Sequence, residues 1–282
     1  MDTPAVLCDL RLFRSALYGC LGQRRDAQFE VVDGLLAAPQ VASLPHLSLL
    51  PLHRRGWGSV YAALAEGRLD GEALRALLTR HPLPDDQPVY AVDLSVWPRC
   101  DAEASPERGF YYHPSRHSAG QPIVAGWAYQ WLAQLSFDRD SWTAPLDVCR
   151  VHPRENAHTV AVAQIMALMA RRPASAATPL FVFDAGYDSA QLTQSLGDAA
   201  VAILVRLRAD RCFYADPPPA VPSPKGGRPR IHGAKFACKD PTTWPVPTTE
   251  QVVEDGQPRA HGRRAGSVHG DADGGAGERE AR

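Results

Sequence analysis

The chain has 282 residues, of which 45% are hydrophobic and 22% are charged, with a net charge of −1. These values are typical of a soluble globular protein with one large or two modest domains, and they exclude a collagen-like or wholly disordered chain. Six scattered cysteines without a CxxC pair favour reduced thiols in a cytoplasmic protein over a disulfide framework or a zinc site. No stretch is apolar for long enough to cross a membrane.

The first 80 residues have a helical pattern. Apolar residues recur at spacings of three to five, for example from Leu10 to Leu17, and prolines interrupt the pattern. We therefore predict a small all-helical N-terminal domain over residues 1–80. Residues 81–88 are rich in proline and acid, which is typical of a linker.

From residue 89 the hydrophobic period changes to two, which predicts a β-strand over 89–96. Large apolar side chains alternate with small ones, and Asp93 lies on the face of the small ones. An aromatic-rich stretch then predicts two further strands, 110–113 and 123–132, joined by a polar loop. Its Trp127, Tyr129 and Trp131 could stack on unpaired bases, but packing within a sheet is the default for aromatic residues at alternating spacing.

The remaining elements alternate between helix and strand. We predict a buried helix over 155–172, a strand over 180–184, a short helix capped by Asp188 or Ser189, and a strand over 201–207. Three β segments followed by helix, strand, helix and strand is the order of an RNase H-like α/β domain, with a mixed sheet flanked by helices. We assign this domain to residues 89–250.

Asp93 and Asp184 are the candidate catalytic residues. Each lies on or at the end of a predicted buried strand, where an unpaired carboxylate is costly and a cation would compensate it. Two carboxylates on adjacent strands can share Mg²⁺ ions that activate water for attack on a phosphodiester. The alternative is that Asp184 caps a turn and Asp93 accepts a backbone hydrogen bond. Gly186 favours a sharp turn that exposes Asp184.

These segments resemble the DDE transposases of bacterial insertion sequences. The matching stretches are AVDLSVWPR (91–99), FVFDAGYDS (181–189) and the intervening YYHPSRHSAGQPIVAGWAYQW (111–131). The resemblance runs from about residue 3 to 250. It implies an RNase H-like fold and Asp93 and Asp184 as the first two acids that bind Mg²⁺ or Mn²⁺. It also implies DNA as partner, at transposon ends and target, and a homo-oligomer when full length, in the cytoplasm and associated with the nucleoid.

The third acid of the family, a glutamate on a late helix, has no clear counterpart. Glu250 and Glu254 are available by position, but neither lies in a helical apolar pattern. Residues 251–282 contain seven Gly and no Leu, Ile, Met or aromatic residue, which predicts a disordered tail. The change in composition after residue 250 is what a reading-frame shift in GC-rich DNA would produce. The catalytic domain is therefore expected to be incomplete.

A basic stretch lies between residues 206 and 239, which contains eight Lys or Arg residues and only two acidic residues. It could neutralise phosphates, although a solvated surface loop is an open alternative for its middle part. The candidate DNA-binding residues are Arg206, Arg208, Arg211, Lys225, Arg228, Arg230 and Lys235.

The sequence thus predicts a transposase that cuts and joins DNA strands with Mg²⁺, inactive or impaired because the third acid is missing. A first alternative is a truncated DNA-binding protein or inhibitor of transposition that does not cleave. A second is an unrelated metal-dependent phosphoesterase whose ligands include His113 or His152; a third is a decayed fragment without function. The polar cluster of Arg108, His113, Arg116 and His117 is expected to be structural rather than catalytic.

Overall fold

The computed structural model describes residues 3–40, 43–84, 86–113, 122–136, 143–173, 176–219, 230–247 and 279–280. The chain divides into two compact units, Met1–Val182 with Asp198–Ile203, and Phe183–Gly197 with Leu204–Arg282. The loop that carries Arg116 and His117, and nearly all of the predicted disordered tail, lie outside the described residues. The domain boundaries drawn from the sequence remain a prediction.

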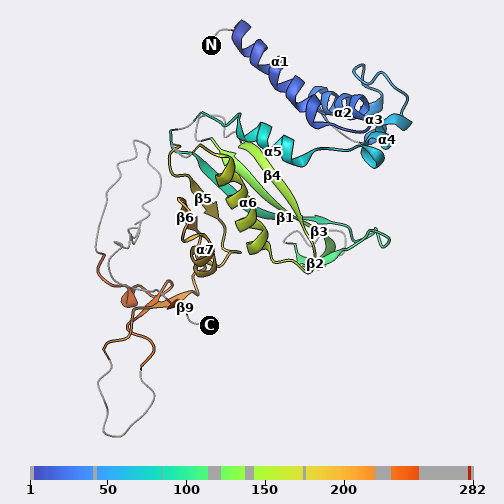
Figure 1. The fold of residues 1–282 in the computed structure, drawn as a ribbon. Helices are drawn as coiled ribbons and strands as arrows, with labels where there is room; N and C mark the ends of the chain where they lie inside the picture. Colours follow the sequence, from blue (N-terminus) through green and yellow to red (C-terminus); the bar gives the residue numbers. More distant parts are fainter. Residues whose placement is uncertain are drawn as a thin grey trace. The chain divides into compact units, whose positions relative to one another are not determined.

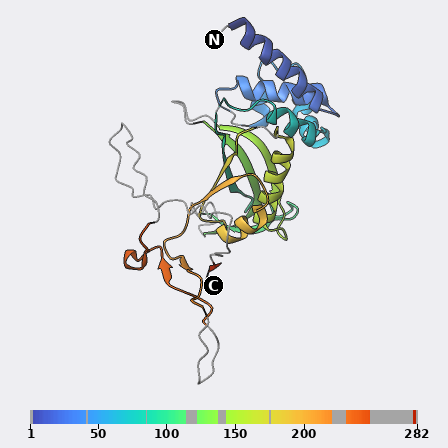
Figure 2. The same cartoon turned by 60° about the vertical axis from the view of Figure 1, so that its left-hand side comes forward.

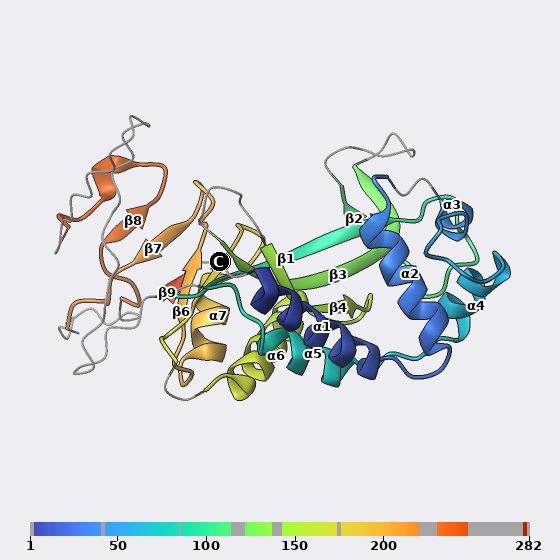
Figure 3. The same cartoon turned by 90° about the horizontal axis from the view of Figure 1, so that it is seen from above.

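Helices open the first unit, as the sequence predicts: α1 (Thr3–Cys20), α2 (Arg25–Ala37), α3 (Leu44–Ser48), α4 (Gly58–Glu66) and α5 (Gly71–Thr79). Helices α2, α3 and α4 pack on one another (Figure 3). Val31, Val60 and Ala63 belong to the buried cluster that joins α2 to α4. Polar side chains cap the first turns of α5 and α3. The Asp70 carboxylate accepts the N–H of Ala73 at the start of α5, and the Ser43 hydroxyl oxygen accepts the N–H of His46 at the start of α3.

A mixed sheet follows the helices, and helices flank it, which confirms the predicted α/β class (Figure 1). The strand order is β2-β3-β1-β5-β6, and β4 also pairs with β3. The pairs β1–β3, β2–β3 and β3–β4 are antiparallel. The strands are β1 (Val89–Pro98), β2 (Gly109–Tyr112), β3 (Ile123–Leu135), β4 (Thr143–Val151), β5 (Leu180–Phe183) and β6 (Ala202–Val205).

The sequence did not predict β4. Its pairing with β3 shifts register between Leu132 and Ala133, and Pro145 lies opposite Ala133, at that irregularity. Proline cannot donate to a ladder, and it is therefore tolerated at bulges and on strands that pair on one side. The proline and the charges of Asp147 and Arg150 hide the alternation that reveals the other strands.

Helix α6 (Ala157–Arg171) packs against β3 and β4, and Figure 2 shows it running alongside the sheet. Its Gln164 donates a hydrogen bond from Nε2 to Asp147 Oδ2 over 3.1 Å. Asp147 pairs directly with Leu132, and directly paired residues of an antiparallel pair share a face. We call the side of β1, β3 and β4 that carries Leu132 and Asp147 the covered face.

The opposite side of the same strands is the open face. It carries Asp93 and Trp131, which lie directly opposite one another on β1 and β3. Burial along the strands follows the alternation: Tyr90, Val92 and Leu132 are buried, whereas Asp93 and Trp131 are exposed. Side-chain alternation thus separates a packed surface from one that is open to solvent.

The second unit contains α7 (Ser189–Leu196), which begins at Asp188 as predicted, since the Asp188 carboxylate accepts the N–H of Gln191. Its small antiparallel sheet has the order β8-β7-β9, with β7 (Cys212–Tyr214), β8 (Lys235–Ala237) and β9 (Arg279–Glu280). The short 3-10 helix Pro241–Thr243 follows β8. Trp244 closes this part of the unit by donating from Nε1 to the carbonyl of Ala237 over 2.9 Å.

Candidate active site

Asp93 lies at the middle of β1 on the open face. Its Oδ1 accepts the N–H of Leu94 over 2.9 Å, and its carbonyl oxygen accepts a bond from Gln130 Nε2 over 3.0 Å. The side chain is exposed. The sequence argument that burial makes this carboxylate costly is therefore wrong, because alternation identifies the face of a strand but does not tell whether another element covers that face.

Asp184 directly follows β5 and begins a tight turn. Its Oδ1 accepts the N–H of Gly186 over 2.9 Å, and Phe183 and Tyr187 anchor the turn through ring contact at 5.1 Å. A Cβ atom at position 186 would come to 3.0 Å from Asp184 Oδ1, which is why glycine suits this position. Asp184 is exposed, as the turn predicts, so burial does not make this carboxylate costly either.

Basic residues of the same unit gather at this turn. Arg208 donates from Nε to the carbonyl of Ala185 over 3.2 Å, and Arg211 forms an ion pair with Asp188 at 3.8 Å. Arg206 is exposed, and its backbone N–H donates to the carbonyl of Phe183 over 3.0 Å. The structure thus brings three of the predicted DNA-binding residues to the Asp184 turn, which the sequence did not indicate.

The other predicted DNA-binding residues are placed only in part. Arg230 and Lys235 are exposed, the latter at the start of β8. Lys225 and Arg228 lie outside the described residues, as do Glu250 and Glu254, the two positions considered for a third acid.

The strands that carry the two acids are neighbours in the sheet. The N–H of Leu180 donates to the carbonyl of Pro88 over 3.0 Å, so the bond joins the first residue of β5 to the residue directly before β1. Carboxylate oxygens are the ligands that Mg²⁺ and Mn²⁺ prefer. Within the described ranges, no group of three or more His, Cys, Asp or Glu residues gathers into a metal site.

The polar cluster predicted to be structural has structural contacts where it is described. Arg108 donates to the carbonyls of Arg99 and Glu103, at 2.7 and 3.3 Å, and so closes the loop after β1. The backbone N–H of His113 donates to the carbonyl of Pro122. His152, the other histidine considered for a phosphoesterase, contacts a Glu107 carboxylate oxygen through Nδ1 at 3.0 Å.

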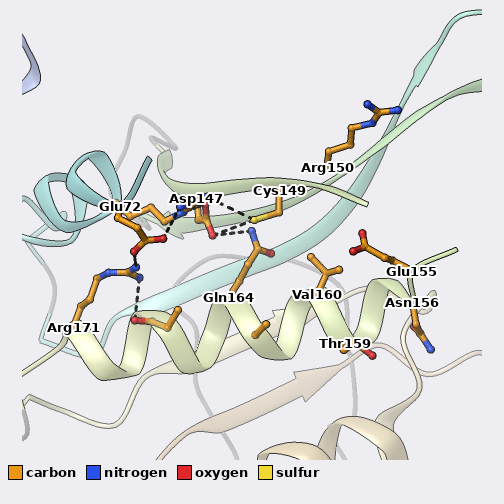
Figure 4. A pocket seen from close by; sticks show the side chains of 13 residues that line it. Glu72, Asp147, Cys149, Arg150, Glu155, Asn156, Thr159, Val160, Gln164 and Arg171 are labelled. Carbon is orange, nitrogen blue, oxygen red and sulfur yellow. Dashed lines mark hydrogen bonds and ion pairs between the residues drawn. The ribbon is translucent and has the colours of Figure 1, made fainter. Parts of the chain in front are cut away.

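A pocket that the sequence did not predict lies between α5, β4 and α6 (Figure 4). Arg75 donates from Nε to Asp147 Oδ1 over 2.5 Å, and Glu72 pairs with both Arg75 and Arg171. The hydrogen bond from Asp147 is the main cause that raises the pKa of Arg75. Because these charges are balanced among themselves, the pocket serves to tie α5 to β4 and α6.

The cysteines do not suggest thiol chemistry. Cys149 lies beside this pocket, and burial raises its pKa above the ordinary thiol value. Burial also raises the pKa of Cys20 and of Cys238. A raised pKa reduces the fraction of thiolate, which is the reactive form. The thiols are all free.

Comparison with known families identifies the class of protein. A family model described as DDE superfamily endonuclease matches residues 16–267, which is most of the chain. The chain therefore belongs to the DDE superfamily of endonucleases. This membership agrees with the mixed α/β fold, and it makes DNA the substrate class and divalent metals the usual cofactors of the relatives.

A comparison with individually curated proteins gave no match. Among the helices of the described part, none is both long and apolar enough to span a bilayer.

Proposed function

We propose that the chain is a transposase subunit that cuts and joins DNA strands at the ends of an insertion sequence. In this proposal Asp93 and Asp184 together hold Mg²⁺ or Mn²⁺. The observation that carries it is the adjacency of β1 and β5 in the sheet. A hydrogen bond joins Pro88 to Leu180 next to the first residues of the two strands. Asp93 follows Pro88 by five residues and Asp184 follows Leu180 by four residues, so the two acids lie at similar distances along their strands.

Each residue of the proposed site has a physical task. Asp93 stands on a strand that is paired on both sides, so its position is set by the sheet ladder. The bond from Gly186 orients the Asp184 carboxylate. Arg206 and Arg208 supply positive charge for DNA phosphates, because guanidinium groups pair well with phosphate oxygens. The bound ion, when present, would activate the attacking water and stabilise the leaving oxygen.

We expect the chain by itself to cleave weakly. Two of the acids are assigned, and a set with fewer carboxylates holds the ions less rigidly. In this proposal the active form is a homo-oligomer in the cytoplasm, associated with the nucleoid through its DNA substrate.

The second candidate is a DNA-binding protein without cleavage activity, which would occupy transposon ends or inhibit the full enzyme. Among the residues that the structure describes, only Asp93 and Asp184 are assigned as acids of the site, and such a reduced set favours this candidate. The phosphoesterase alternative gains no support, because the contact between His152 and Glu107 accounts for that histidine.

A cleavage assay on DNA that carries the ends of the element separates these candidates. We expect strand cleavage that requires Mg²⁺ or Mn²⁺ and is abolished by Asp93→Asn or by Asp184→Asn. Asp198→Asn removes the same charge from an exposed turn and should leave cleavage unchanged. Binding to the ends without cleavage would favour the second candidate, and metal-dependent cleavage that survives Asp93→Asn would contradict the proposed site.

A further inference from the structure

The open face of the sheet is unusually rich in aromatic side chains. The pairing registers of β1, β2 and β3 place six of them on the side that carries Asp93. We call this set the aromatic face: Trp97, Phe110, Tyr112, Trp127, Tyr129 and Trp131. Of these, Phe110 is 80% exposed, Trp97 is 56% exposed and Trp131 is 39% exposed.

Of the three aromatic residues expected to pack within the sheet, Trp131 is exposed, whereas Trp127 and Tyr129 are half-buried. The core lies instead on the covered face, where α6 packs. Contiguous exposed apolar surface of this kind marks a site of interaction rather than ordinary protein surface. Residues 251–282 contain no Leu, Ile, Met or aromatic side chain, so they are poorly suited to cover it.

Two arginines contact the tryptophans: Arg99 contacts both Trp97 and Trp127, and Arg150 contacts Trp127. The guanidinium carbon of Arg99 lies 5.3 Å from the ring centroid of Trp97 and 5.1 Å from that of Trp127, and the guanidinium carbon of Arg150 lies 4.9 Å from Trp127. The Nε atoms of both arginines are buried without a hydrogen-bond partner. Their charge therefore lies over aromatic rings at the distance of a cation–π contact.

The two arginines differ in how much of their charge is compensated. Arg150 donates to the carbonyls of Pro106 and Glu107 at 3.0 Å and lies 3.8 Å from the Glu107 carboxylate. Arg99 has no ion pair within the described part of the chain. The aromatic face thus carries uncompensated positive charge as well as exposed rings.

The aromatic face also reaches the proposed catalytic acid. Trp131 pairs directly with Asp93 across the strands, and such opposite side chains have Cβ atoms only about 5 Å apart. Trp131 donates from Nε1 to Ser95 Oγ over 2.7 Å, which fixes the orientation of its ring. A planar group stacked on Trp131 would lie beside Asp93.

We propose that the aromatic face binds the unpaired bases of a DNA strand next to Asp93. Exposed rings offer stacking to any base, and a guanidinium group offers a partner for phosphate, which together match single-stranded DNA. Duplex DNA matches less well, because its bases are already stacked. The inference deepens the proposed function and rests on it only for the role of Asp93.

Single-stranded binding can be measured apart from cleavage, with a dT oligonucleotide and an oligonucleotide of equal length that lacks bases. The test variant is Trp97→Ala with Trp131→Ala. We expect it to lose on the order of tenfold in affinity for the dT strand or more, and to change little toward the abasic strand. Trp97→Phe with Trp131→Phe keeps the rings and should recover most of the affinity.

The matched control is Trp57→Ala, which removes a 69% exposed tryptophan from the N-terminal helices and should leave both affinities unchanged. Circular dichroism of each variant verifies folding. Equal affinity of wild type and alanine variant for the dT strand would overturn the inference, even if Mg²⁺-dependent cleavage is present. If the wild type binds the dT strand but never cleaves DNA, and the alanine variant loses that base-dependent binding, the inference is supported and the proposed function is removed.

A protein partner is the other occupant of such a surface. If the alanine variant changes the oligomeric state by light scattering and not the affinity for the dT strand, the face is an interface between copies of the chain and the inference is wrong.

Discussion

The two faces of the sheet are built from the same strands and have opposite properties. On the covered face, even polar groups are buried and paired, and Gln130 and Gln134 are 0% exposed. On the open face, Asp93, Trp97 and Trp131 stay in contact with solvent, although Asp93 and Trp131 alternate with buried neighbours along their strands. The covered face contributes stability, whereas the open face is available for binding and chemistry. Substitutions on the two faces should therefore have different effects.

The largest effect on stability is expected at the ion pair between Arg75 and Asp147. Asp147→Asn removes the less exposed of the two charged partners of the Arg75 guanidinium, which is 27% exposed, and leaves it paired with Glu72, whose side chain is 72% exposed. Removing one partner of a buried pair costs about 3–5 kcal/mol, and partial exposure reduces this to about 2–4 kcal/mol here. Urea unfolding measures the free energy of unfolding. Asp198→Asn is the control with the same charge change, and an equal effect of both variants would contradict the assignment.

A smaller loss is expected at Gln134, whose amide group bonds to both backbone groups of Leu83. Its Oε1 accepts the N–H of Leu83 and its Nε2 donates to the carbonyl of Leu83, each over 3.0 Å. Gln134→Ala should lower the free energy of unfolding by about 1–3 kcal/mol, because these groups lose their partners. Gln194→Ala, on the exposed side of α7, should change it by less than about 0.5 kcal/mol. If the two variants unfold alike, the segment that contains Leu83 does not depend on Gln134.

The smallest effect on stability is expected on the open face. Trp97→Ala removes a ring that is 56% exposed and one cation–π contact with Arg99, which together contribute about 1 kcal/mol or less. Thermal and urea unfolding should therefore show a stable protein, while single-stranded DNA binding is weakened. A loss as large as that of Asp147→Asn would show that Trp97 belongs to the core, and the contrast between the faces would be wrong.

The sequence predicted which residues share a face of a strand, but it did not predict which face another element covers. Alternation along residues 89–96 predicted the strand and the residues that share a face with Asp93. It did not predict which face is covered, because that depends on where α6 packs. For this reason the expectations of a buried Asp93 and of a packed Trp131 are both wrong.

Local chemistry was predicted more reliably than contacts between distant segments. Gly186 and Asp188 indicated the turn and the helix cap after β5, because both depend on neighbouring residues only. The gathering of Arg208 and Arg211 at that turn depends on the path of the chain after β6. The ion pair of Arg75 with Asp147 likewise joins residues that are far apart in the sequence, and no local pattern indicates it.

We propose that Asp93 and Asp184 hold the same divalent ion, and metal-directed cleavage of the protein can test whether they do. Fe²⁺ replaces Mg²⁺, and ascorbate with peroxide then generates radicals that cut the backbone near the bound ion. If the two aspartates share the ion, we expect cuts beside residue 93 and beside residue 184, both suppressed by excess Mg²⁺ and both lost in Asp93→Asn. Cuts at one position alone, or cuts at 184 that persist in Asp93→Asn, would contradict this proposal.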